Sequence, residues 1–81
     1  MMTVGLRLRA ARESTGMSVA DVAAATRLRA SIIEAMEADD FSLCGGVAYA
    51  RGQLRMMAPF IGLDPDEIAE YFDSQSPDLG Y

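Results

Sequence analysis

Helix signals recur along the whole sequence, and they constrain the fold of this chain more than any other feature. β-Branched residues are few, and no stretch alternates apolar and polar residues as a half-buried strand would. Apolar residues instead recur at the spacing that gathers them on one face of a helix. The pattern predicts an all-α fold, and 81 residues are enough for one small domain with a modest core.

Five helices are predicted, and capping residues mark where several of them begin. Thr3 can cap the first helix, and Ser18, with Asp21 three positions later, can cap the second. Asp64, followed by Pro65, is the strongest capping signal in the chain and starts the fifth helix. The predicted helices span residues 4–14, 19–25, 30–38, 47–60 and 65–73.

The apolar positions of these helices predict the core. The residues expected to face inward are Val4, Leu8, Ala11, Val22, Ala23, Leu28, Ile33, Met36, Val47, Ala50, Leu54, Met57, Ala58, Ile61, Ile68 and Phe72. In the loop at 39–46, Phe41 and Leu43 are expected to anchor the chain, and Gly45 with Gly46 permits a backbone reversal. Pro59 lacks a backbone N–H, so it should loosen the last turn of the fourth helix.

The absence of certain residue types excludes most catalytic chemistry. All positive charge comes from seven Arg, because the chain has no Lys and no His, and Cys44 is its single Cys. These absences exclude His-based triads, His metal sites, phosphate-binding lysines and Schiff bases. One Cys can form neither an internal disulfide nor a zinc cluster. We therefore expect no enzyme, no metal and no cofactor, with Cys44 as a loop residue rather than a nucleophile.

Domain organisation and location also follow from composition. Residues 1–73 are expected to form one helix-turn-helix domain, and residues 74–81 a flexible tail or the start of a linker. No apolar run approaches the roughly 18 residues of a membrane span, and no signal peptide opens the chain. A lone Cys fits a reducing compartment, so the expected location is the cytoplasm.

Residues 17–37 have the layout of a helix-turn-helix. A short capped helix carries the small residue Ala23 where the next helix would cross it, and a brief connection with apolar Leu28 follows. A second helix then turns Ile33 and Met36 inward. The layout resembles the phage-repressor (Cro-type) family, in which the position of Arg27 is often Gly.

Three motifs extend the resemblance to nearly the whole chain. EADDF at 37–41, YARGQLR at 49–55 and GLDPDE at 62–67 resemble the N-terminal domain of the RodZ cell-shape proteins. The resemblance implies a five-helix cytoplasmic domain, followed through a linker by a membrane helix, that docks on the bacterial actin-like filament protein MreB. It also implies an aromatic pair one turn apart on the fourth helix as the filament contact. Tyr49 matches the first position of that pair, and Gln53 departs from the second. The expected partner is therefore MreB or another cell-division or envelope protein.

A second apolar stripe on the fourth helix supplies candidate protein-binding residues. Tyr49, Gln53, Met56 and Phe60 follow one another at helical spacing behind the core face. Arg51 lies beside them and could pair with an acidic partner. The alternative is that the fifth helix covers Met56 and Phe60, and that Arg51 pairs with a nearby acid at little net gain.

A sequence-specific DNA-binding regulator is the alternative function. Residues 30–39 contain no Arg, Lys, Asn or Gln, which are the usual donors to base edges. They carry three acids expected to repel phosphate, Glu34, Glu37 and Asp39. The candidate DNA contacts are Arg12, Arg27, Arg29 and Ser31. Five Arg against two acids in residues 1–33 favour this alternative, whereas the total charge of −5 opposes it. A structural adaptor that binds neither ligand is a third interpretation.

Overall fold

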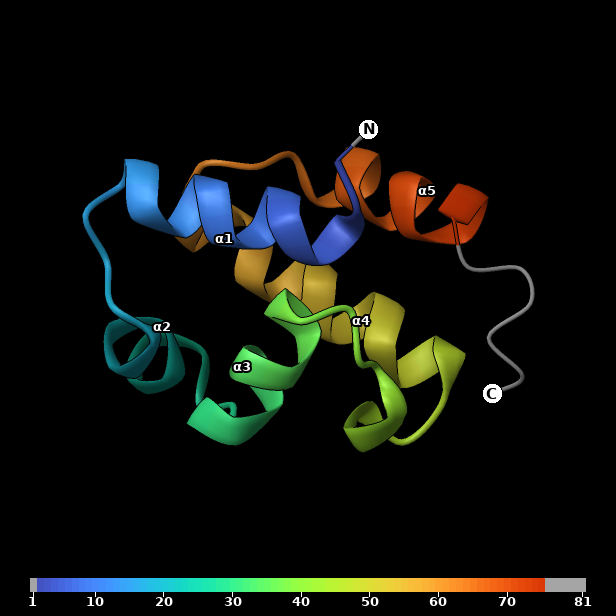
Figure 1. Cartoon of the computed structure of the whole chain (residues 1–81), viewed down its shortest axis with the longest axis horizontal. Helices are drawn as coiled ribbons and strands as arrows, with labels where there is room; N and C mark the ends of the chain where they lie inside the picture. Colours follow the sequence, from blue (N-terminus) through green and yellow to red (C-terminus); the bar gives the residue numbers. More distant parts are fainter. Residues whose placement is uncertain (1, 76–81) are drawn as a thin grey trace.

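Five α-helices follow one another in the computed structural model, which describes residues 2–75 (Figure 1). The α-helices are α1 (Val4–Ser14), α2 (Val19–Thr26), α3 (Ala30–Glu37), α4 (Val47–Met57) and α5 (Pro65–Gln75). Two short 3-10 helices, η1 (Ser42–Cys44) and η2 (Ala58–Ile61), lie on either side of α4 along the chain. The predicted all-α fold with five helices and a helix-turn-helix is confirmed.

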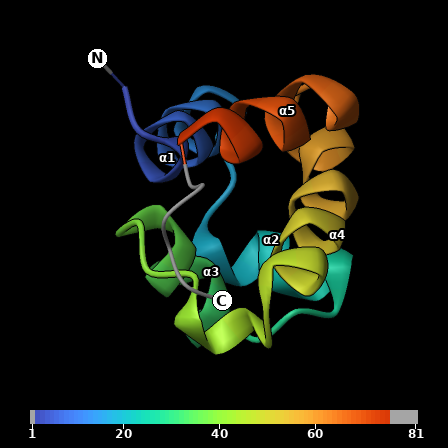
Figure 2. The same cartoon turned by 90° about the vertical axis from the view of Figure 1, so that its right-hand side faces the viewer.

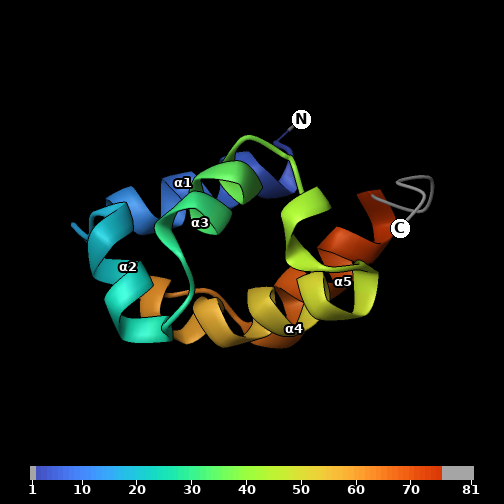
Figure 3. The ribbon, with the colours of Figure 1, turned by 90° about the horizontal axis from the view of Figure 1, so that it is seen from below.

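The helices surround one interior. Figure 2 shows α1 and α5 side by side above α2, α3 and α4. Seen from below, α3 lies next to α1, and α4 runs along the opposite side next to α5 (Figure 3). α2 lies at one end of the molecule with α3 beside it, and α4 runs along the side opposite α3 (Figures 1 and 3).

The predicted capping residues hold the helix starts as expected. Thr3 Oγ1 accepts a hydrogen bond from the backbone N–H of Leu6 at 3.2 Å. Ser18 and Asp21 form a complete capping box, in which each side chain accepts from the other residue's backbone N–H, at 3.0 and 2.9 Å. Asp64 Oδ1 accepts from the next two available N–H groups, those of residues 66 and 67, at 2.9 and 3.1 Å.

Helix ends differ from the predicted ones by small amounts. The second helix is one residue longer than predicted and the third one residue shorter. α4 ends at Met57 and continues as η2, because Pro59 cannot donate to the α-helical ladder; the predicted loosening of this turn is confirmed. α5 extends through Gln75, so only residues 76–81 of the predicted tail remain, and these lie outside the described residues.

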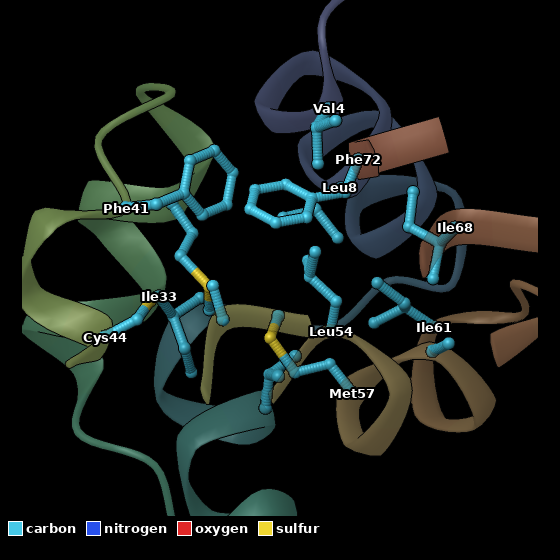
Figure 4. Close-up of a cluster of buried hydrophobic side chains, with 14 residues drawn as sticks. Val4, Leu8, Ile33, Phe41, Cys44, Leu54, Met57, Ile61, Ile68 and Phe72 are labelled. Atoms are coloured by element: carbon cyan, nitrogen blue, oxygen red, sulfur yellow. The ribbon is translucent and has the colours of Figure 1, made fainter. Parts of the chain in front are cut away.

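Side chains from every helix meet in the core (Figure 4). The buried apolar residues are Val4, Leu8, Val22, Ile33, Met36, Phe41, Cys44, Ala50, Leu54, Met57, Ala58, Ile61, Ile68, Ala69 and Phe72. The rings of Phe41 and Phe72 pack edge to face, with centroids 4.9 Å apart, and so join the loop before α4 to α5. Four residues predicted to face inward are only half-buried against this core: Ala11, Ala23, Leu28 and Val47.

The prediction that Leu43 anchors the loop is wrong. Leu43 is 56% exposed, and Cys44 is buried in its place. The reason lies in η1, because a 3-10 helix has three residues per turn and aligns positions three apart. Phe41 and Cys44 therefore face the core together, and Leu43 points away from it.

A glycine permits α1 to approach the end of α3 closely. A Cβ atom on Gly5 would lie 2.6 Å from the carbonyl oxygens of Met36 and Glu37 and 2.8 Å from Asp39 Oδ1. No real Cβ tolerates such contacts, so the crossing requires glycine. This junction sets the position of α3 relative to α1.

Candidate protein-interaction surface

One side of α4 and η2 carries exposed apolar side chains that no other helix within residues 2–75 covers. Tyr49 is 69% exposed, Met56 43% and Phe60 46%. They lie at helical spacing away from the buried side of α4, which is formed by Ala50, Leu54 and Met57. We call Tyr49, Gly52, Met56 and Phe60 the outer face of α4. α5 packs against α4 but leaves Met56 and Phe60 exposed.

Gly52 belongs to this face although apolar spacing alone does not single it out. It is exposed in the middle of α4, three positions after Tyr49 and four before Met56. A glycine inside a strong helical pattern is the sequence signal that could have drawn attention to it.

The two arginines of α4 join this helix to α5. Arg51 Nε donates to both carboxylate oxygens of Asp73, at 2.9 and 3.0 Å, and Arg55 pairs with Asp66. The hydrogen bond to Asp73 raises the pKa of Arg51 above its ordinary value. Both pairs are exposed and contribute little to stability. They neutralise the charges beside the outer face of α4.

Gln53 turns away from the exposed stripe in which the sequence placed it. Its Nε2 donates to the carbonyl oxygen of Cys44 at 3.4 Å, and the residue is half-buried. Its Oε1 is buried and accepts no hydrogen bond from the described residues. Gln53 thus supports the loop that precedes α4 rather than extending the exposed apolar surface.

The turn of the helix-turn-helix contains a residue in the left-handed region. Arg27 ends α2 with φ 62° and ψ 19°, a conformation that favours glycine. This explains why the Cro-type pattern often has Gly at this position. Arg27, Arg29 and Ser31 are exposed, and within residues 2–75 the guanidinium groups of both arginines are unpaired. These three side chains remain accessible at the start of α3.

Arg12, the fourth candidate DNA contact, is occupied within the fold. Its Nε and Nη2 donate to the two carboxylate oxygens of Glu37 at 2.7 and 3.0 Å, and its Nη1 donates to the carbonyl of Met17 at 3.0 Å. The side chains of Arg12 and Glu37 are only 14% and 10% exposed. The hydrogen bond to Glu37 raises the pKa of Arg12 above its ordinary value.

Two of the three acids expected to repel phosphate have internal partners instead. Glu37 binds Arg12, and Asp39 accepts from Thr3 Oγ1 at 2.7 Å and from the backbone N–H of Gly5 at 2.8 Å. Glu37, whose side chain is only 10% exposed and paired with Arg12, is therefore poorly placed to repel phosphate, whereas Asp39 stays exposed. Glu34 alone of the three is exposed on α3 without such a partner among the described residues.

The remaining candidate groups form no reactive site in the described residues. Burial raises the pKa of the Cys44 thiol, and the nearby charge of Asp40 raises it further, so the thiolate nucleophile is disfavoured. Within residues 2–75, no three Cys, Asp or Glu side chains are arranged to hold a metal ion. The same residues include no helix long and apolar enough to cross a membrane.

Comparisons with known proteins agree with this architecture. The model of a family described as a helix-turn-helix domain matches residues 7–68. The cytoskeleton protein RodZ of Streptococcus pneumoniae is 35% identical over 74 residues, which cover 91% of this chain. The chain spans 27% of the length of that relative. No solved structure matches it significantly.

Proposed function

The chain belongs to the helix-turn-helix family and is a RodZ-like N-terminal domain, and we propose that it acts as a protein-interaction module in cell-shape or envelope morphogenesis. Its proposed partner is the bacterial actin-like filament protein MreB. The matched relative is named as a cytoskeleton protein, which supports a role of this kind.

The exposed outer face of α4 carries this proposal. Tyr49, with two thirds of its surface free, is the most exposed large apolar residue of the described chain. Tyrosine is enriched at the energetic centres of protein interfaces, because it combines a large apolar surface with a polar group. Met56 and Phe60 extend the same surface. Arg51 and Gln53 are proposed to hold α5 and the preceding loop in place around it.

Geometry favours protein binding over DNA binding. The exposed side of α3 presents Ala30, Ser31 and Glu34, and only the serine hydroxyl can donate to a base. Arg12 is held by Glu37, so Arg27 and Arg29 remain as phosphate contacts. Two arginines attract the DNA backbone only weakly, because electrostatically driven DNA binding typically uses about six to ten phosphate contacts.

The proposed setting is the cytoplasmic end of a longer, membrane-anchored protein. The chain matches about a quarter of its relative, so a linker after α5 that leads to a membrane segment fits the proposal. In this arrangement α5 lies at the membrane-proximal end of the domain.

Two substitutions separate the candidate functions. Tyr49→Ala should weaken binding to purified MreB, and Arg29→Ala should leave it unchanged. A fluorescence-anisotropy titration with duplex DNA at low salt provides the second measurement, in which Arg29→Ala should matter and Tyr49→Ala should not. If Tyr49→Ala leaves MreB binding intact, the proposal fails; if the wild type binds DNA specifically, the regulator becomes the better candidate.

A further inference from the structure

The last turn of α5 is helical although its own residues favour an end to the helix. Asp73 and Ser74 are poor helix formers, and this turn carries no basic residue to offset the negative end of the helix dipole. Sequence spacing predicts an end at Asp73, whereas α5 continues to Gln75. Contacts from other parts of the chain supply what this turn lacks.

The segment before α1 supplies hydrogen bonds. The carbonyl oxygen of Met2 accepts from the hydroxyl of Tyr71, and it also accepts from Nε2 of Gln75 at 3.2 Å. Tyr71 and Gln75 lie one helical turn apart on α5, so a single carbonyl group ties both sides of the last turn. The end of α5 lies over the start of α1 in this way (Figure 2).

Two guanidinium groups supply the positive charge. Arg7 of α1 lies over the ring of Tyr71, with its Cζ 4.4 Å from the ring centroid. Arg51 of α4 donates to both carboxylate oxygens of Asp73. A cation near the carboxyl end of a helix is favourable, and α5 receives both cations from its neighbours rather than from its own sequence.

α5 therefore has a firmly held part and a weakly held part. The bonds to Met2 and the pair between Arg51 and Asp73 are exposed, so each contributes little to stability. Phe72, directly before Asp73, is fully buried and packs against Phe41. The boundary between the two parts lies between residues 72 and 73.

Resting on the proposed membrane-anchored setting, we propose that Met2, Arg7, Tyr71 and Gln75 form a latch that lets the last turn of α5 open separately from the core. Tension between the filament and the membrane would act on the chain where it leaves α5. The latch then yields before Phe72 leaves the core, and residues 73–75 lengthen by about 5 Å as they become extended. The latch takes up the first part of the load and the core stays folded.

Hydrogen exchange of single amides, followed by NMR on the whole chain, tests the separate opening. In the wild type, residues 73–75 should be protected, but less than the amides of Leu8 and Leu54, and their exchange should depend little on added urea. Tyr71→Phe removes only the hydroxyl that donates to Met2, and it should speed exchange at residues 73–75 about three- to tenfold. Tyr49→Phe is the matched control, because it removes a hydroxyl for which no hydrogen bond is seen in the described residues, and it should change nothing.

A pulling experiment tests the response to load. The chain is held at position 49 and at its C-terminal end in an optical trap. Tyr71→Phe should unfold the core at the same force as the wild type, because the latch has already opened. Arg12→Ala should lower that force, because the bond to Glu37 lies within the folded core.

The outcomes separate the latch from the proposed function. The latch is overturned if residues 73–75 are unprotected in the wild type, if they exchange only together with the core, or if Tyr71→Phe leaves their exchange unchanged. It is also overturned if Tyr71→Phe lowers the unfolding force as much as Arg12→Ala. Neither measurement involves MreB or a membrane, so these results leave the proposed function standing. Intact MreB binding by Tyr49→Ala would remove the proposed setting without removing the latch.

Discussion

The guanidinium group of Arg12 and the carboxylate of Glu37 meet through two hydrogen bonds, of 2.7 and 3.0 Å, that join the last part of α1 to the final residue of α3. Both side chains are nearly enclosed. Arg12, one of the five arginines of residues 1–33, thus stabilises the helix-turn-helix and is not exposed for phosphate binding.

Arg12→Ala should therefore destabilise the domain. We expect the free energy of unfolding to fall by about 2–3 kcal/mol, because Glu37 would keep a poorly solvated charge without its partner. Arg9→Ala is the control, since Arg9 forms an exposed pair with Glu13 at 3.5 Å and should change stability by less than about 0.5 kcal/mol. Urea unfolding measures both, and equal effects would contradict a structural role for Arg12.

Arg27→Gly should stabilise the domain. The left-handed φ of 62° costs an L-residue about 1 kcal/mol relative to glycine, and no described contact of the Arg27 side chain offsets this cost. The expected gain raises the melting temperature by about 4–8 °C in a domain of this size. Arg29→Gly provides the comparison, because Arg29 has an ordinary extended backbone with φ −69° and should gain nothing. A lower melting temperature for Arg27→Gly would show that its side chain stabilises the turn.

Gln53→Met should raise stability slightly and preserve the outer face of α4. The substitution removes a buried oxygen that has no partner in the described residues, and it removes only one long hydrogen bond, of 3.4 Å. We expect the free energy of unfolding to rise by about 0.5–1 kcal/mol in chemical denaturation. Destabilisation would instead indicate that the bond to the Cys44 carbonyl holds η1 in place.

Acid should remove the stabilisation that the capping box gives to α2. The backbone N–H of Ser18 and its hydroxyl bind the Asp21 carboxylate and lower the pKa of Asp21 below its ordinary value. A carboxylate with a lowered pKa stabilises the fold above the unfolded pKa of about 3.9, and this stabilisation is lost as the pH falls through the lower folded value. Asp21→Asn should thus differ from the wild type most at neutral pH, and the difference should shrink below about pH 4. Unfolding curves between pH 7 and about pH 2 test this; a constant difference would exclude the linkage.

Local signals in the sequence were sufficient for much of the fold. Ser18, Asp64 and the apolar spacing around Leu54 act within one or two helical turns, so sequence order alone reveals them. The pairing of Arg12 with Glu37 spans 25 positions, and it depends on how α1 crosses α3. Leu43 was misplaced because its orientation follows from the 3-10 geometry of η1, which the spacing of apolar residues does not distinguish from an ordinary loop.

The same contrast between local signals and tertiary contacts applies to the candidate protein-interaction surface. Exposure of Tyr49 agrees with the stripe read from the sequence, since it depends on the phase of one helix. The inward turn of Gln53 depends on the Cys44 carbonyl, which reaches α4 only after the chain reverses at Gly45 and Gly46. Tertiary placement of that loop, rather than helical phase, decides which residues remain on the surface.

All three acids of the EADDF segment at 37–41 bind partners of the same domain. Glu37 accepts from Arg12, Asp39 accepts from the start of α1, and Asp40 accepts from Ser42. Phe41, the last residue of the segment, is buried in the core. A motif whose side chains all bind within the domain identifies the fold and not the binding partner. Two chains that share it should superimpose, yet they need not recognise the same partner. Binding specificity within such a family should instead vary with positions 49, 52, 56 and 60, where a substitution alters the outer face of α4 and leaves the scaffold unchanged.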